Sequence, residues 1–170
     1  MNRPMTPEPM DVHATQTGWR KLRGKLFHVW FLLRRPLTGG VRAIVHDATA
    51  GSVFLIRHTY VPGWQLPGGG VELGESFEEA LARELAEEGN IELLGPPVLR
   101  SLHLNAHVSR RDHVAVYLVT AFRQTAPRGP DREIAEAGFF ALNALPSETT
   151  GGTRRRLDEV FGGAAPIRHW

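Results

Sequence analysis

The sequence predicts an α/β fold in which a mixed β-sheet is flanked by helices. Segments rich in apolar and β-branched residues, typical of strands, alternate unevenly with segments of helical periodicity. Some strand-like segments follow one another directly, as in hairpins, which fits a mixed sheet better than a regular doubly wound fold. A length of 170 residues is sufficient for one domain with a sizeable core.

The composition excludes several kinds of chemistry. The chain has no cysteine, so disulfides, thiolate nucleophiles and cysteine zinc sites are ruled out. The longest apolar run, residues 26–33, has eight residues, far fewer than the roughly 20 that span a bilayer. It also lacks the features of a signal peptide. We therefore expect a cytoplasmic protein without a transmembrane segment.

The N-terminal part differs from the rest. Residues 1–17 contain three prolines and are predicted to be a disordered leader. In residues 18–36, apolar side chains recur at three- and four-residue spacing, which predicts a basic amphipathic helix. Its apolar positions are Trp19, Leu22, Leu26, Val29, Trp30 and Leu33. We expect this helix to pack on the domain formed by residues 37–170, although its charge also leaves peripheral contact with a membrane open.

The strands can be assigned in order. Residues 41–47 and 53–58 read as two strands joined by a turn. Residues 60–75 are too rich in glycine and proline for a long element and are predicted to form a loop with at most a short strand. Further strands are expected at 98–104, 113–122 and 138–142, followed by a final helix at 153–161.

A helix is predicted from residue 76 to about residue 88. Ser76 begins it, and Glu79 three residues later completes a capping box. Asn90 is a plausible left-handed cap after the last turn, because asparagine tolerates this conformation better than most residues.

Three glutamates of this helix are predicted to share one face. At 100° per residue, Glu84, Glu87 and Glu88 fall within an arc of about 100°, beside the apolar Leu81 and Leu85. Like charges so close repel each other, and a cation is expected to offset that cost. Magnesium is suited to carboxylate oxygens and bridges substrate phosphates. The alternative, a solvated acidic face, suits Glu78 and Glu79.

The glycine run before the helix strengthens the metal interpretation. Gly68, Gly69 and Gly70 permit backbone conformations with positive φ and let the main chain approach a ligand closely. A carbonyl of this loop is a possible neutral oxygen ligand beside the three carboxylates.

The residues of the loop and the helix together resemble the signature of the Nudix hydrolases. Gly69 is followed by five residues and Glu75, then by seven residues and the segment RELAEEGNI at 83–91. Seven polar or glycine positions and two apolar positions are specified over these 23 residues. The single departure is Asn90, where the family normally has glycine.

The resemblance implies a fold, an activity and a set of roles. The fold would be an α/β/α sandwich around a mixed sheet, and the activity would be hydrolysis of nucleoside diphosphates linked to another moiety, with Mg²⁺ or Mn²⁺. The metal ligands would be Glu84, Glu87, Glu88 and the carbonyl of Gly68. Glu75 and Arg83 would form a structural ion pair that ties the loop to the helix.

The general base and the substrate contacts are less constrained. Glu84 and Glu133 are the candidate bases, and the nearby Glu136 is an alternative to Glu133. Tyr60 and Trp64 flank the glycine loop, where each could stack a base or belong to the core or its rim.

A basic cluster spans the polar loop between the strands predicted at 98–104 and 113–122. It contains Arg110 as a candidate phosphate contact, and a solvated surface is the other interpretation. The cluster consists of His103, His107, Arg110, Arg111 and His113.

The expected partner is a small nucleotide diphosphate. Markers of the ADP-ribose, diadenosine polyphosphate and NADH subfamilies are missing, and the sequence does not determine the oligomeric state. A second hypothesis is a non-catalytic nucleotide sensor whose basic arm binds nucleic acid or membrane. It is disfavoured because all signature carboxylates are present and 40 residues hold no separate DNA-binding domain. A third hypothesis, isomerase chemistry on a prenyl diphosphate, would need a catalytic cysteine. It is disfavoured because the chain has none.

Overall fold

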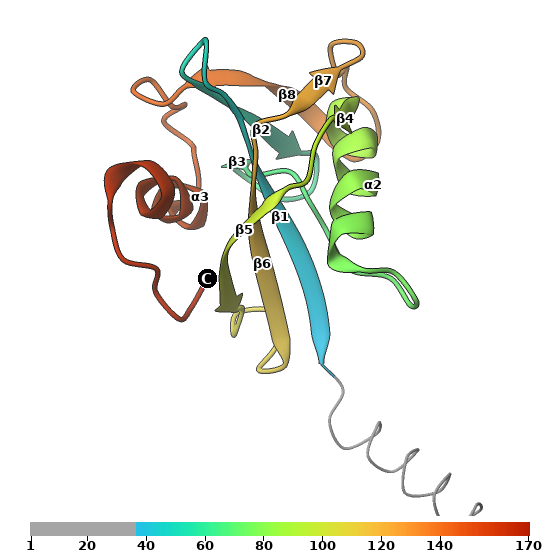
Figure 1. Cartoon of the computed structure of the whole chain (residues 1–170), viewed down its shortest axis with the longest axis vertical. Coiled ribbons are helices and arrows are strands. Elements are labelled where there is room, and N and C mark those ends of the chain that lie inside the picture. The colour runs from blue at the N-terminus through green and yellow to red at the C-terminus, as the bar shows by residue number, and fades with distance from the viewer. Residues whose placement is uncertain (1–36) are drawn as a thin grey trace, which may run out of the picture. The chain divides into compact units, whose positions relative to one another are not determined.

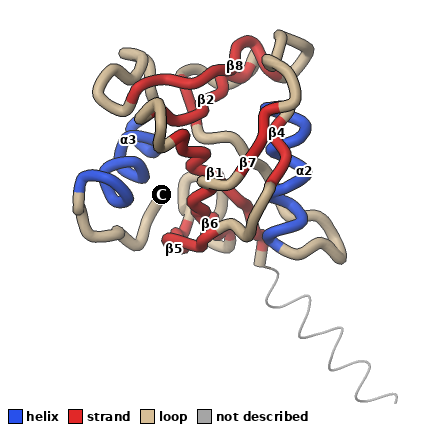
Figure 2. The backbone as a smooth tube through the Cα atoms, turned by 45° about the horizontal axis from the view of Figure 1, so that its top comes forward, coloured by secondary structure: helices blue, strands red, loops and turns tan. Residues whose placement is uncertain are grey.

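The computed structural model describes residues 37–170. The predicted leader at 1–17 and the predicted helix at 18–36 lie outside the described residues. Helix α2 (Phe77–Gly89) covers one face of the sheet and α3 (Gly151–Leu157) lies on the other (Figures 1 and 2). This arrangement confirms the predicted α/β/α sandwich around a mixed sheet.

The strands are β1 (Thr38–Asp47), β2 (Ser52–His58), β3 (Trp64–Gln65), β4 (Ile91–Leu93), β5 (Val98–Leu104), β6 (Asp112–Val119), β7 (Phe122–Gln124) and β8 (Ile134–Ala141). The main sheet has the order β3-β2-β1-β6-β5, and β8 pairs with β2 along its whole length, from Ser52 to His58. Strands β1 and β6 run parallel, and all other pairs are antiparallel. Strands β4 and β7 form a separate two-stranded sheet.

Strand β1 carries core residues on both faces because successive side chains point to opposite sides. Val41, Ala43 and Val45 belong to the apolar cluster beneath α2, and Ile44 belongs to the cluster beneath α3. All four are fully buried. By the same alternation, Arg42 points to the α3 side of the sheet.

The glycine loop is attached to the edge of β1 that β2 leaves open. The amide of Val41 donates to the Gly69 carbonyl and the amide of Ala43 donates to the Pro67 carbonyl, both at 2.9 Å. Gly68 has φ = 133°, and a Cβ there would lie 2.2 Å from the Val41 carbonyl oxygen. Only glycine fits this position, so the loop can pack directly against the backbone of β1.

The second half of the chain differs from prediction in detail. The strand expected at 113–122 is two strands, because the chain leaves the main sheet after Val119 and β7 pairs with β4 instead. The three-residue strand β4 was not predicted. Strand β8 begins at Ile134, earlier than expected. The final helix changes into a π-helical turn, η1 (Asp158–Gly162).

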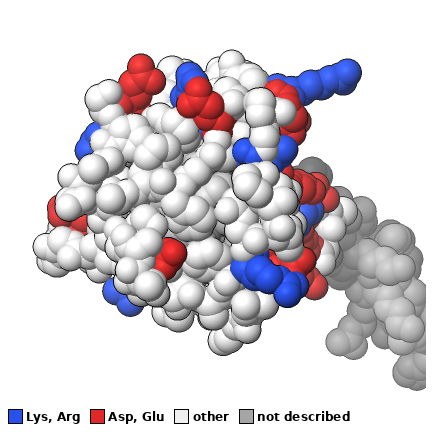
Figure 3. All heavy atoms as spheres, turned by 90° about the horizontal axis from the view of Figure 1, so that it is seen from above, with Lys and Arg blue, Asp and Glu red and all other residues white. Residues whose placement is uncertain are grey.

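The described residues include no candidate membrane-spanning helix, and the face shown in Figure 3 carries charges of both signs. Within residues 37–170, no helix has the length and apolarity to cross a membrane. On the face seen from above, acidic and basic side chains of the described part are scattered mainly around the margin, and the centre is uncharged (Figure 3).

Candidate functional site

Helix α2 is fixed at both ends. The Ser76 hydroxyl accepts a hydrogen bond from the Glu79 amide, and the Glu79 carboxylate accepts one from the Ser76 amide, which is the predicted capping box. At the other end, Asn90 adopts the left-handed conformation with φ = 52°. Its side-chain amide also donates to the carbonyls of Ala126 and Pro127, at 3.4 Å each. Asparagine thus replaces the usual glycine and adds a tie to a neighbouring loop.

Arg83 connects α2 to the glycine loop. Its Nε lies 2.9 Å from Glu75 Oε1, and its Nη2 donates to the Gly70 carbonyl at 3.0 Å. Its Nη1 lies 2.8 Å from Glu84 Oε1 and 3.5 Å from Glu87 Oε2. Hydrogen bonds to Glu75 and Glu84 raise the pKa of Arg83, and the bond from Arg83 lowers the pKa of Glu75.

Glu88 is the buried carboxylate of the three, with a residue exposure of 8%. Its Oε2 accepts a hydrogen bond of 2.6 Å from the Gly68 amide, and its Oε1 lies 3.7 Å from His58 Nε2. Burial raises the pKa of Glu88 to about 7, and the Gly68 hydrogen bond and the Arg42 charge oppose this shift. The environment therefore lacks the positive charge that would fully stabilise an ionised carboxylate.

The side chains and backbone carbonyl at this site have the chemical character of ligands for a divalent cation. Three carboxylates and a loop carbonyl form an all-oxygen donor set of the kind that Mg²⁺ prefers. The Gly69 backbone also leaves room for a carboxylate, because a Cβ there would lie 2.3 Å from Glu84 Oε1.

The three carboxylates do not converge as the side chains stand. Glu84 is paired with Arg83, and the Glu87 side chain is 62% exposed. Within the described part of the chain, no three acidic or histidine side chains are close enough together to chelate an ion. Binding a cation therefore requires side-chain rotations around the fixed backbone of α2.

Arg42 lies at the same glycine loop, and the sequence analysis did not identify it as a site residue. Its Nη1 donates to the Leu66 carbonyl at 3.2 Å and also to the carbonyl of Gly68. Burial lowers the pKa of Arg42, and the carboxylates of Glu88 and Glu84 oppose the shift. The signal for this residue was present, since a charged residue in the middle of an apolar strand requires a buried partner.

The two candidate bases near β8 are separated by the fold. The Glu133 carbonyl accepts a hydrogen bond of 2.9 Å from the Thr59 amide, which brings Glu133 to the segment next to Glu88. Burial raises the pKa of Tyr60, and the charges of Glu133 and Glu88 raise it further. Glu136 instead forms an ion pair of 2.5 Å with Arg57 on the neighbouring strand.

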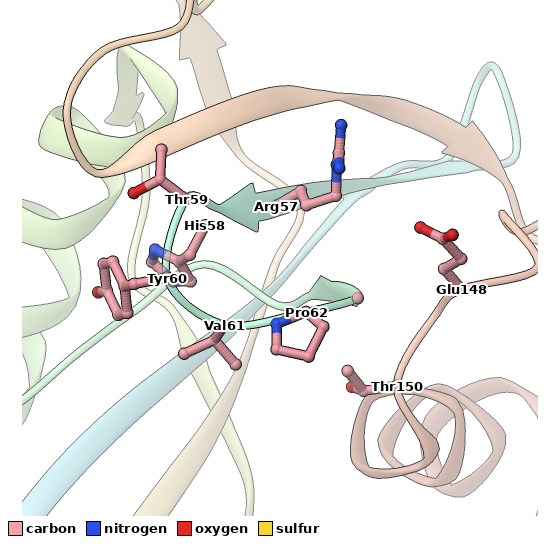
Figure 4. A pocket seen from close by; sticks show the side chains of 9 residues that line it. Arg57, His58, Thr59, Tyr60, Val61, Pro62, Glu148 and Thr150 are labelled. Atoms are coloured by element: carbon pink, nitrogen blue, oxygen red, sulfur yellow. The ribbon is translucent and has the colours of Figure 1, made fainter.

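The cavity beside this segment has a volume of about 680 Å³. Tyr60 and His58 line its end nearer α2, and Glu148 and Thr150 line its end nearer α3 (Figure 4). Tyr60 is 68% exposed and accessible to a ligand. Trp64, the other predicted aromatic, is 9% exposed and packs in the core, which is the alternative left open in the sequence.

The predicted basic cluster is divided. His103 is fully buried, because its side chain points to the α3 side of β5 and contacts Arg156, so the expectation that it belongs to a surface cluster was wrong. Arg110 is exposed in the loop between β5 and β6. His107, from the same loop, lines a cavity of about 260 Å³ with Arg42, Arg155 and Trp170.

Comparisons with known proteins agree with this geometry. A family model described as NUDIX domain matches residues 36–160. ADP-ribose pyrophosphatase of Methanocaldococcus jannaschii is 33% identical over 140 residues, which cover 74% of this chain and 79% of that protein. A protein of Mycobacterium tuberculosis named "Putative mutator protein MutT4" is 34% identical over 102 residues, 57% of this chain. The chain spans only 40% of the length of that relative. A solved structure, a MutT NUDIX hydrolase from Burkholderia pseudomallei, has a TM-score of 0.62 at 32% identity, covering 72% of this chain and 97% of its own.

Proposed function

Because the chain belongs to the Nudix hydrolase family, we propose that it cleaves a phosphoanhydride bond in a nucleoside diphosphate linked to another moiety, with Mg²⁺ or Mn²⁺. The observation that carries the proposal is Glu88, a carboxylate buried against the amide of Gly68 with its pKa raised to about 7 by burial. Perturbed carboxylates of this kind are typical of functional sites.

The proposed ligands are Glu84, Glu87, Glu88 and the carbonyl of Gly68. A bound divalent cation would supply charge neutralisation for the diphosphate and lower the pKa of a water molecule. To join the ligand set, Glu84 and Glu87 release Arg83, which keeps its bonds to Glu75 and to the Gly70 carbonyl. The loop therefore stays attached to the helix while the carboxylates turn.

The general base is proposed to be Glu133 or Glu84. Glu133 lies in a turn held by Asp131, whose carboxylate accepts hydrogen bonds from the amides of Glu133 and Ile134 at 2.8 Å and 2.7 Å. A fixed turn limits the positions that an exposed carboxylate can reach, which favours a defined approach to a water molecule.

The nucleoside part of the substrate is proposed to occupy the cavity lined by Tyr60, whose ring is free to stack on a base. The names of the relatives, an ADP-ribose pyrophosphatase and a mutator protein, indicate which substrates to include. The panel consists of nucleoside triphosphates, their deoxy and oxidised forms, nucleotide sugars, ADP-ribose and dinucleotides. Products are identified with Mg²⁺ and with Mn²⁺.

The metal site is tested by Glu88→Gln, with Glu78→Gln as the matched control on the exposed side of α2. We expect Glu88→Gln to reduce activity at least about a thousandfold, equivalent to ~4 kcal/mol, and to weaken Mg²⁺ binding. Glu78→Gln should match the wild type. Substantial Mg²⁺-dependent hydrolysis by Glu88→Gln, with loss in Glu78→Gln, would refute the proposed site.

The base is tested by comparing Glu133→Gln with Glu84→Gln. If Glu133 is the base, its variant keeps metal affinity near normal but loses turnover and the gain in rate at alkaline pH. If Glu84→Gln loses turnover and the alkaline gain in rate while metal saturation is maintained, and Glu133→Gln does not, the base is Glu84. Nucleotide binding without hydrolysis of any panel compound would favour the sensor hypothesis.

A further inference from the structure

The guanidinium of Arg42 lies where the proposed site most needs positive charge. It donates to the carbonyl of Gly68, the same carbonyl that is proposed to bind the metal. The carboxylate charges that act most strongly on it are those of Glu88 and Glu84, which are also proposed ligands. One arginine therefore contacts or faces three of the four proposed ligand groups.

Arg42 reaches the Gly68 carbonyl from the side opposite α2. Its neighbours Val41 and Ala43 pack beneath α2, so the Arg42 side chain emerges on the α3 face. Glu88, by contrast, binds the Gly68 amide from α2. The backbone of Gly68 therefore lies between two charged side chains. Arg42 binds its carbonyl from one face of the sheet, and Glu88 binds its amide from the other.

Arg42 is partly buried and faces two cavities. It lines the 260 Å³ cavity with His107, Arg155 and Trp170, and also a second cavity of about 210 Å³ beside Gly69 and Gly70. Arg42 makes no ion pair closer than 4 Å to a carboxylate of the described residues, and its known hydrogen bonds go to two neutral carbonyls. A guanidinium that is bound only to neutral carbonyls retains its affinity for an anionic group that enters one of these cavities.

We propose that Arg42 is the resident cation of the site, which holds the Gly68 carbonyl while no metal is bound and exchanges it for a substrate phosphate when a divalent cation takes that carbonyl. In this exchange the carboxylates have a cation near them in both states. It also links metal loading to the presentation of a phosphate-binding group. The binding of a substrate phosphate by Arg42 rests on the proposed function. The exchange of the Gly68 carbonyl between Arg42 and the metal can be tested without a nucleotide.

The first experiment measures Mn²⁺ binding to the full chain without nucleotide, from the electron paramagnetic resonance signal of the free ion. Arg42→Met removes both charge and donor, and Arg42→Gln removes the charge but keeps a donor for the carbonyl. Arg57→Met, on the adjacent strand and paired with Glu136, is the matched control. We expect the two Arg42 variants to bind Mn²⁺ about tenfold more tightly than the wild type, and Arg57→Met to be unchanged.

The second experiment measures binding of α,β-methylene-ADP, which cannot be cleaved at its diphosphate, at saturating Mg²⁺ by calorimetry. We expect the Arg42 variants to bind this analogue about tenfold or more weakly than the wild type. Arg42→Lys, which keeps the charge, should retain most of the affinity. Thermal unfolding of the metal-free proteins shows which variants are folded, and Arg42→Gln serves if Arg42→Met is not.

Mn²⁺ affinity that is unchanged or lower in a folded Arg42 variant overturns the inference, as does unchanged binding of the analogue. The proposed function fails by a different result, namely Mn²⁺ binding by the wild type that Glu88→Gln does not weaken. The two failures are therefore distinguishable.

Discussion

At the scale of single residues, Glu88 illustrates the cost of keeping a carboxylate buried beside the glycine loop. Among residues 37–170, only the Gly68 amide donates a backbone hydrogen bond to its carboxylate, and burial raises its pKa from 4.5 to about 7. The folded state then holds the Glu88 proton more tightly than the unfolded state does. Without metal, the free energy of unfolding should therefore fall as the pH rises from about 4.5 to about 7.

This linkage gives a stability prediction. In EDTA at pH 8, Glu88→Gln should be more stable than the wild type by up to about 3 kcal/mol, because the variant has no charge to bury. The difference should vanish near pH 4, where Glu88 is protonated in both states. Saturating Mg²⁺ should stabilise the wild type but not the variant. Urea denaturation at several pH values measures all three effects, and a Glu88→Gln curve parallel to that of the wild type would contradict the prediction.

At this scale the sequence predicted the burial of one proposed ligand but not how the side chains of the proposed site are paired. The helical phase put Glu84, Glu87 and Glu88 at the edge of the core, and Glu88 is indeed buried. It could not show that Arg83 pairs with Glu84, because this depends on side-chain rotation. Arg42 was missed because its partners are backbone carbonyls of a loop that is distant in sequence.

At the scale of elements, α2 and the glycine loop behave as one unit joined by Arg83. Arg83→Ala removes the bonds to Glu75 and to the Gly70 carbonyl, so activity and stability should fall together. The pair is partly exposed and screened by solvent, and we expect a decrease in melting temperature of about 2–4 °C with at least a tenfold loss of activity. An inactive variant with an unchanged melting temperature would indicate that Arg83 contacts the substrate directly.

Elements with strong local signals were predicted, and those fixed by distant partners were not. Ser76, Glu79 and Asn90 identified both ends of α2 because capping is local. Strand β4 has three residues, too few for a periodic pattern, and it exists because it pairs with β7. The split of the strand expected at 113–122 has the same cause.

At the scale of the whole described domain, a buried polar network holds the segment after η1 against the sheet. Arg156 is fully buried. Its Nη2 lies 2.6 Å from Glu159 Oε1, and its Nη1 lies 2.6 Å from His103 Nδ1. His103 Nδ1 also lies 2.7 Å from the Ile167 carbonyl oxygen. Burial, followed by the Arg156 charge, lowers the pKa of His103 below its ordinary 6.5.

This network predicts acid sensitivity. A depressed histidine pKa contributes stability above pH 6.5 that is lost as the pH falls towards the folded-state pKa. In His103→Gln, whose side chain cannot become charged, the free energy of unfolding should depend less on pH below 6.5. Because Glu88 contributes with the opposite sign between pH 4.5 and 7, the comparison is made in a Glu88→Gln background, again by urea denaturation. An identical pH slope with and without His103 would show that another group is responsible.

The parallel pairing of β1 with β6 has a consequence for the order in which the domain folds. Thr38 pairs with Asp112, 74 residues away, so the central strand acquires this partner only after a long loop closes. Strand β2 pairs with β1 in register at only two positions. For the earlier part of this edge of β1, the partner is the glycine loop, whose carbonyls accept hydrogen bonds from the amides of Val41 and Ala43. The loop that is proposed to bind the metal is thus also the first segment of the nascent chain that can cover the edge of β1 at Val41 and Ala43.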